Sequence, residues 1–171
     1  ALVAFQAFRQ CLDILKGYTI VVYAASEDMK IASHLFTQET GIPINIIPPA
    51  SVSEQEILSQ FGKARIYIGL SISDGISTSL LEAMVMGAFP IQSCTACADE
   101  WIEGGKSGII VQPEDPDEIA NAIRRALTDA TLVNQAAETN TNTVKERLGH
   151  SKINQQVVTM YQNVFESQKD L

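Results

Sequence analysis

The sequence predicts an α/β fold in which helices flank a doubly wound parallel sheet. Short apolar runs rich in β-branched residues alternate along the chain with longer segments of helical periodicity, which is the pattern of βαβ units. The run at residues 19–24 shows no alternation of polar and apolar side chains, as expected for a strand that is buried on both faces. Right-handed crossovers between such strands place ligands outside the carboxyl ends of the sheet.

The first elements follow from periodicity and from helix-terminal residues. Residues 1–15 carry apolar side chains at helical spacing, and Gly17 ends that helix. After the first strand, Ser26 is placed to cap a second helix, which stops at residues 41–43, Gly-Ile-Pro. A second short strand is expected at residues 44–47, where two prolines end it.

The middle of the chain repeats this alternation. Ser53 and Glu56 form a capping box for a helix through Gly62. A third strand at residues 65–70 precedes a polar segment at residues 71–79 that is rich in serine. Further elements are expected as a helix at about 78–86, a strand at 89–92, a helical turn at 99–102 and a strand at 108–111.

Three helical segments end the sequence. Asp115 as N-cap and Pro116 as first helical residue predict a helix to about residue 127, so the acidic residues there need no metal to explain them. Helices at about residues 129–148 and 151–168 follow. The apolar face of the last helix is interpreted as packing surface, part of which is left bare in this chain: Ile153, Val157, Tyr161, Val164 and Phe165.

Composition limits the classes of function. The chain has 171 residues, which predicts one domain, and a net charge of −8, which argues against a nucleic-acid binder and a polybasic membrane clamp. No apolar run approaches the ~18 residues of a membrane span, and no signal peptide is recognisable. Three cysteines do not form a disulfide framework, so we expect a reducing, cytoplasmic compartment.

The segment at residues 71–90 contains the strongest candidates for ligand-binding and catalytic residues. It follows a buried strand and leads into a helix whose free N–H groups favour anionic or oxygen-rich ligands. Gly75 allows a close approach or a positive φ, and the carboxylates of Asp74 and Glu82 can face one cleft. Two structural alternatives remain open: Glu82 could complete a capping box with Ser79, and Asp74 could bond within its own turn.

The same segment resembles the donor-binding signature of group 1 (family 4) retaining glycosyltransferases, which have the two-domain GT-B architecture. The matching residues are Asp74-Gly75, then Glu82 within Leu-Glu-Ala-Met at residues 81–84, then residues 87–90, Gly-Ala-Phe-Pro. The elements around Glu100, residues 108–111 and residues 113–119 follow in the family's order. The resemblance covers about residues 17–127 and implies one Rossmann-like half of a GT-B enzyme.

The resemblance implies a role for each matched residue. Glu82 would hold the ribose hydroxyls of a nucleotide sugar, UDP- or GDP-linked, and Asp74 would face the donor sugar as the catalytic carboxylate. The remaining positions would line the donor (Gly75, Ile76, Ser77 and Ser79) or meet its base (Pro48, Ser51 and Val52). The reaction would transfer the sugar to an acceptor hydroxyl with retention of anomeric configuration, without metal or other cofactor.

Some positions depart from the family pattern. Asp74 stands where the family usually has Glu, Ser77 where it often has Gly, and Ala96-Cys97 where it has Gly-Gly. The Arg and Lys that grip the donor diphosphate in the family have no counterpart here. We therefore expect residues 1–171 to be the C-terminal, donor-binding domain, truncated at its N-terminus and extended by the helices of residues 129–169. The isolated chain would be inactive without an N-terminal domain.

Other interpretations stay open. A non-catalytic Rossmann-like module that binds a nucleotide or a partner, and a nucleotide-sugar epimerase of the same fold, are the alternatives. Cys94 and Cys97 form a CxxC that lacks a second pair, so we interpret them as buried or half-buried structural thiols rather than a redox or zinc site. Surface polysaccharide synthesis in the cytoplasm, or at the inner membrane as a peripheral protein, is the expected setting.

Overall fold

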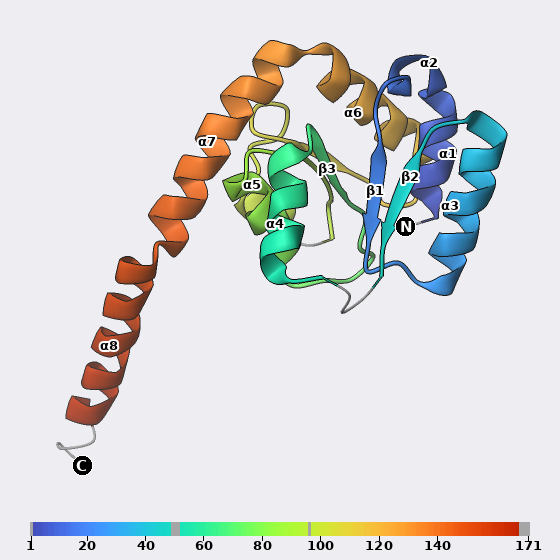
Figure 1. Cartoon of the computed structure of the whole chain (residues 1–171). Helices are drawn as coiled ribbons and strands as arrows, with labels where there is room; N and C mark the ends of the chain where they lie inside the picture. Colours follow the sequence, from blue (N-terminus) through green and yellow to red (C-terminus); the bar gives the residue numbers. More distant parts are fainter. Residues whose placement is uncertain (1, 49–51, 96, 168–171) are drawn as a thin grey trace.

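The computed structural model describes residues 2–48, 52–95 and 97–167, and it has the predicted parallel α/β fold (Figure 1). All strand pairs are parallel. The strands form two hydrogen-bonded groups, β1 (Ile20–Tyr23) with β2 (Ile44–Ile47), and β3 (Ile66–Gly69), β4 (Phe89–Ser93) and β5 (Ile109–Val111) in that order. Side chains of both groups, among them Ile20 and Ile68, pack into one core, so the two groups share a single folded unit.

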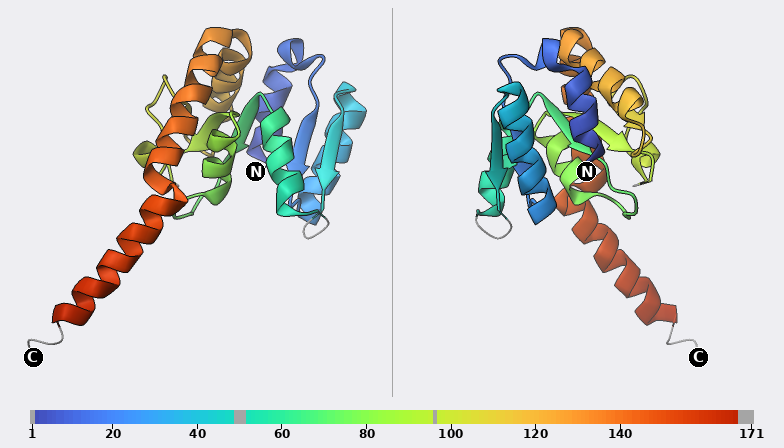
Figure 2. Two further views of the ribbon diagram at one scale, coloured as in Figure 1. Left: turned by 60° about the vertical axis from the view of Figure 1, so that its left-hand side comes forward. Right: turned by 90° about the vertical axis from the view of Figure 1, so that its right-hand side faces the viewer.

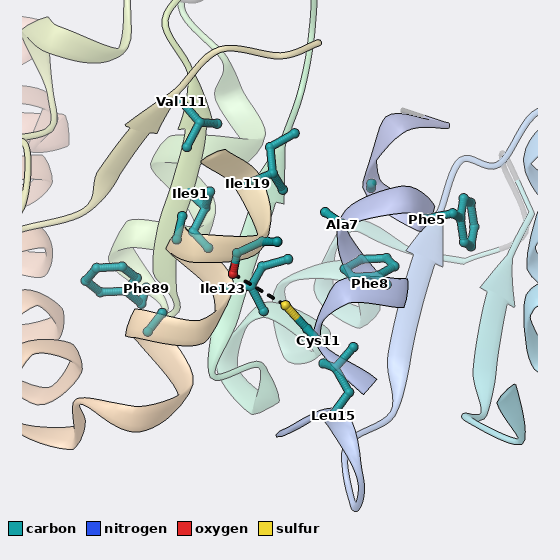
Figure 3. Close-up of a cluster of buried hydrophobic side chains, with 14 of the residues drawn as sticks. Phe5, Ala7, Phe8, Cys11, Leu15, Phe89, Ile91, Val111, Ile119 and Ile123 are labelled. Carbon is teal, nitrogen blue, oxygen red and sulfur yellow. Dashed lines mark hydrogen bonds between the residues drawn. The ribbon is translucent and has the colours of Figure 1, made fainter. Parts of the chain in front are cut away.

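Helices cover both faces of the β3–β4–β5 sheet, which makes the fold doubly wound. Alternation along each strand sends Ile91 and Val111 into a core covered by α1 (Val3–Gln10) and α6 (Pro116–Thr128), and Figure 3 shows this cluster. On the other face Tyr67 lies in a second core, which is covered by α4 (Glu54–Lys63), α5 (Thr78–Val85) and α7 (Ala130–Leu148). Because both faces of the sheet are covered by helices, the carboxyl edge is the part of the sheet at which a ligand can be bound.

The predicted helix starts are confirmed by hydrogen bonds. The Ser26 hydroxyl accepts from the Met29 N–H at the start of α3 (Glu27–Thr40). Ser53 and Glu56 form a complete capping box at α4. Asp115 accepts from two backbone N–H groups at the start of α6, so the acidic cluster there is a helix cap. Local sequence signals thus set where these three helices begin.

The first predicted helix is interrupted. Cys11, with φ −115°, separates α1 from α2 (Leu12–Leu15), and its thiol donates to the Ala120 carbonyl of α6. The prediction of one continuous helix over residues 1–15 was wrong because this bond and the packing of α1 against α6 compete with helix continuation. The predicted helical turn is the 3₁₀ turn Ala98–Glu100, and the strands are within two residues of their predicted ends.

The last helix, α8 (His150–Ser167), extends away from the body of the molecule (Figures 1 and 2). None of its described residues is buried. Its apolar residues are instead exposed: Val157, Val158, Met160, Tyr161, Val164 and Phe165. Among the helices of the described chain, none has the length and apolar character needed to cross a bilayer. The predicted apolar face is therefore present and largely bare.

Candidate functional site

The β3–α5 loop, residues 70–77, lies at the carboxyl edge of the sheet and holds most of the predicted site residues. Asp74, Gly75 and Ile76 are exposed in it. Ser77 is 8% exposed and caps α5, its hydroxyl accepting from the Leu80 N–H at 3.3 Å. The backbone N–H groups of residues 72–79 donate to no acceptor in the part of the chain that the structure describes. The loop thus presents free donors to a ligand.

Glu82 is half-buried in the second turn of α5, and its carboxylate is not used to cap the helix. Because the cap is Ser77, Glu82 stands five residues after it instead of the three that a capping box requires. The capping-box alternative with Ser79, which is half-buried in the first turn, was therefore wrong. Burial, and secondarily the charge of Glu54 on α4, raises the pKa of the Glu82 carboxyl above its usual range.

Within the described chain, the carboxylate of Asp74 is likewise not used in a hydrogen bond that stabilises the loop. Its carboxylate accepts no hydrogen bond from a described residue, so the alternative in which it bonds its own turn was wrong. Its charge acts on the hydroxyl of Tyr67 beneath the loop and contributes to raising the pKa of that hydroxyl, after burial and Tyr23. Asp74 and Glu82 are therefore carboxylates with unused acceptor capacity on one loop–helix unit.

The start of the loop is fixed by the neighbouring strand. The hydroxyls of Ser93 and Thr95, at the end of β4, both donate to the carbonyl of Ser71. These two residues were not predicted, although their place at the carboxyl end of a strand was the available signal. The bonds anchor the loop at its first residues and leave Asp74 and Gly75 free to face a ligand.

The predicted base-proximal residues lie at the start of α4. Pro48 directly follows β2, Val52 is half-buried, and Ser51 lies outside the described residues. Glu54, in the first turn of α4, is close enough to Glu82 for its charge to act on that carboxyl. The β2–α4 segment and the β3–α5 loop consequently border the same region at the carboxyl edge.

Cys94 and Cys97 are free thiols, and both are exposed. The prediction of buried or half-buried thiols was wrong because β4 ends at Ser93, which puts the CxxC in the turn outside the sheet. Within residues 2–48, 52–95 and 97–167, no three His, Cys, Asp or Glu residues are placed to hold a metal ion together.

Replacing Gly75 by Ala is expected to spare the fold and to weaken ligand binding. A Cβ built at Gly75 meets nothing within 4 Å, and its φ is not positive, so the change costs little stability. An added methyl group would nevertheless occupy the space in which a ligand approaches the free N–H groups. Thermal unfolding is expected to be unchanged, while a ligand that approaches these N–H groups is expected to bind more weakly in titration calorimetry. Unchanged affinity in this variant would contradict a close approach at Gly75.

Comparisons with known proteins identify the family of the chain. The model of the family "Glycosyl transferases group 1" matches residues 4–144. An uncharacterised glycosyltransferase of Methanocaldococcus jannaschii is 32% identical over 157 residues, which are 90% of this chain and 38% of that protein. The chain thus spans less than half the length of this curated relative.

Solved structures share the fold. A Rickettsia africae glycosyltransferase superposes with a TM-score of 0.78 at 16% identity, over 96% of this chain and 44% of that one. Anabaena HepE in complex with UDP-glucose gives 0.78 at 18% identity, over 94% and 44% of the two chains. The C-terminal domain of a group 1 protein from Francisella tularensis gives 0.70 at 22% identity, over 85% and 77%. The chain therefore has the fold of one Rossmann-like half of a GT-B enzyme, and it belongs to the group 1 glycosyl transferases.

Proposed function

We propose that this chain is the donor-binding, C-terminal domain of a retaining glycosyltransferase and that it binds a nucleotide sugar at the carboxyl edge of the sheet. The observation that carries the proposal is the unused carboxylate of Glu82 beside a loop whose N–H groups have no described acceptor. A nucleotide sugar offers the complementary groups, because its ribose hydroxyls are donors and its diphosphate oxygens are acceptors. The complex of Anabaena HepE with UDP-glucose supports this class of ligand.

The proposal assigns a role to each group of site residues. The ionised carboxylate of Glu82 accepts hydrogen bonds from the ribose hydroxyls, and Pro48, Ser51 and Val52 border the base. The N–H groups near Gly75 hold diphosphate oxygens. During transfer, the bond between the anomeric carbon and the diphosphate oxygen breaks, and the diphosphate leaves with the electron pair. The acceptor oxygen then bonds to that carbon with retained configuration, and the proton of the acceptor hydroxyl passes to the departing diphosphate oxygen.

Asp74 is the catalytic carboxylate in this proposal. Positive charge develops at the anomeric carbon as the leaving group departs, and a carboxylate at the tip of the loop stabilises that charge. Asp74 is exposed, and no described residue competes for its oxygens. The side chain is one methylene shorter than Glu, so the loop itself must bring it to the sugar. The anchor of Ser71 to Ser93 and Thr95 supports such a fixed loop.

Calorimetry with this chain tests the proposal. UDP, GDP, ADP and their glucose or mannose conjugates are titrated at up to millimolar concentration, with and without EDTA. We expect binding of one nucleotide class, unaffected by EDTA because the proposal uses no metal. If neither this chain nor a longer chain that includes this domain binds any of these nucleotides, the assignment is wrong. Comparing the two proteins separates a wrong assignment from a diphosphate grip that lies outside this chain.

We further propose that the bare face of α8 packs against a preceding domain of the same protein. The chain spans 38% of its archaeal relative and 44% of the R. africae enzyme, so such proteins have room for a second domain. In a longer chain that includes this domain, amide exchange along α8 is expected to be slower than in the 171-residue chain. Equal exchange in the two proteins would contradict the contact.

We propose that the protein is located in the cytoplasm or at the inner face of the cytoplasmic membrane. We propose polysaccharide synthesis as the process in which it acts. All three cysteines are free thiols, and such thiols persist in a reducing compartment. Labelling of Cys94 and Cys97 in intact cells, compared with lysed cells, tests this placement. Both thiols are expected to be reduced and to be labelled by an impermeant reagent only after lysis.

A further inference from the structure

A small polar cluster is buried beneath the β3–α5 loop, and the proposed reaction does not use it directly. Tyr67 of β3 is 6% exposed, and its ring packs edge-on against Phe61 of α4 with centroids 5.7 Å apart. Phe61 contacts Tyr23 of β1 in the same way at 5.6 Å. Phe61 therefore lies between the two tyrosine rings, and its edge-on contact restrains the Tyr67 ring on one side.

The hydroxyl lies over Gly69, at the end of β3. A Cβ built on Gly69 would fall 2.7 Å from the Tyr67 hydroxyl oxygen and would also collide with the Oε1 atom of Gln92. Gly69 and Gln92 are register partners on adjacent strands. The space that a side chain at position 69 would fill is therefore occupied by two polar atoms from neighbouring positions. A glycine is required there for this close approach.

Gln92 is a costly residue to bury. It is 0% exposed, its Nε2 donates to the Ser93 hydroxyl at 3.3 Å, and its Oε1 has no partner among the described residues. A buried amide oxygen without a donor is unfavourable by itself, which points to a role beyond packing. Ser93 in turn donates to Ser71, the second residue of the β3–α5 loop. Gln92 thus joins the sheet to the start of that loop.

Ser77, at the other end of the same loop, also acts on the Tyr67 hydroxyl. Burial, then the hydroxyl of Tyr23 and the charge of Asp74, raise the pKa of Tyr67, whereas the Ser77 hydroxyl acts to lower it. Tyr67 therefore stays protonated and keeps a hydrogen to donate. Ser77 is the residue that caps α5. Ser77 thus lies between the buried cluster and the free N–H groups at the start of α5.

We propose that Tyr67 is a positioning residue: its buried hydroxyl, held by Phe61 and set beside Gln92 over Gly69, supports Ser77 and keeps the Asp74 turn where it meets the diphosphate and sugar of the donor. Tyr67 itself is covered by the loop and touches no donor atom. The inference rests on the proposed function for the identity of the ligand, but the support of the loop is a property of the free chain.

Tyr67→Phe tests the inference because it keeps the ring and removes only the hydroxyl. In the ligand-free chain, amide exchange at Leu80 and Leu81, whose N–H groups donate to Ser77, is expected to become about fivefold faster, since the buried polar support of Ser77 is lost. Exchange in β4 and α6 is expected to stay unchanged. Tyr161→Phe is the matched control, because Tyr161 is 67% exposed on α8. Unchanged exchange at Leu80 and Leu81 would overturn the proposal, whatever ligand the chain binds.

Ligand titrations with the same variant separate positioning from general damage. The affinity for the nucleotide sugar is expected to fall about fivefold, while the affinity for the free nucleoside, which Glu82 meets, stays within twofold. Equal losses for both ligands would show a structural role only and would contradict the inference. Gly69→Ala gives a second test, since the added Cβ displaces the Tyr67 hydroxyl together with the Gln92 amide without removing either, and the same selective loss is expected. A wild-type chain that binds no nucleotide would refute the proposed function, whereas the exchange experiment would still decide the role of Tyr67.

Discussion

Glu82→Ala is expected to weaken binding of the nucleoside diphosphate by about 100-fold. Two ribose hydroxyls donate to this carboxylate in the proposed complex, and a hydrogen bond to a charged group contributes about 1.5–3 kcal/mol. Calorimetry measures the change, and Glu138→Ala on the exposed face of α7 is the matched control. The ribose role would be refuted by an Ala variant that retains wild-type affinity.

Removing the charge of Glu82 should leave the fold intact. The pKa of Glu82 is raised above its ordinary value, first by burial and then by Glu54. The folded chain thus holds this proton more tightly than the unfolded chain, so the ionised carboxylate opposes folding at neutral pH. That opposition is relieved as the pH falls through the raised value. Glu82→Gln is therefore expected to unfold at the same temperature as the wild type at pH 7, or at a higher one.

The raised pKa also gives binding a pH dependence. Hydroxyl groups donate to the ionised form of Glu82, so the affinity for the free nucleoside should decline as the pH drops through the raised pKa, at a higher pH than an ordinary Glu would show. A nucleoside is the appropriate probe because it carries no phosphate that titrates. The profile of Glu82→Gln is expected to be flat over the same range. An identical decline in both proteins would assign the titration to another group.

Gly108→Ala is expected to produce a clear loss of stability. A Cβ at position 108, just before β5, would lie 2.8 Å from Pro90 Cγ, 2.9 Å from the Pro90 carbonyl oxygen and 2.9 Å from Ile102 Cγ2. A proline ring and a backbone oxygen cannot move aside cheaply, so we expect a cost of about 1–3 kcal/mol. In a chain of this size, each kcal/mol lowers Tm by roughly 2–4 °C.

Gly104→Ala is the control for that experiment. Gly104 lies in the same connection to β5, but an added Cβ there meets nothing within 4 Å, and the residue has no positive φ. Differential scanning calorimetry should show a lowered Tm for Gly108→Ala and no resolved shift for Gly104→Ala. Similar behaviour of the two variants would mean that the connection relaxes and that the packing of Gly108 against Pro90 is not restrictive.

Elements with local causes were predicted well from the sequence. The capping box of Ser53 and Glu56, and the cap at Asp115 followed by Pro116, involve residues within one helical turn, and both helices begin where expected. The break at Cys11 has a different origin. Its thiol bonds to Ala120, 109 residues further along the chain, and no local pattern contains that information.

Tertiary contact also overrides weak helix propensity in α7. Residues 139–143 are Thr-Asn-Thr-Asn-Thr, which are poor helix formers, yet the helix is continuous through them. Asn140 is fully buried there, and its amide donates to the Ser107 carbonyl at 2.7 Å. The helix is therefore maintained by a contact with a distant loop, which outweighs the intrinsic preference of the segment.

The candidate site was predictable only in part. The motif predicted the β3–α5 loop and Glu82 as candidate site residues, because these residues are close together in the sequence. The supporting residues Tyr67 and Gln92 were missed, since their roles depend on which strands are neighbours and on the register that sets Gly69 beside Gln92. The helix cap was likewise ambiguous, because several serines precede α5 and only the backbone path identifies Ser77.

The division of the strands into two hydrogen-bonded groups has a consequence for the site. The segment that follows β2 belongs to the β1–β2 pair, whereas the loop that follows β3 belongs to the β3–β4–β5 sheet. No strand-to-strand hydrogen bond links these groups within the described chain; side-chain packing, including the rings of Tyr23, Phe61 and Tyr67, joins them. The relative position of the two walls of the site therefore depends on side-chain packing and not on a continuous backbone ladder.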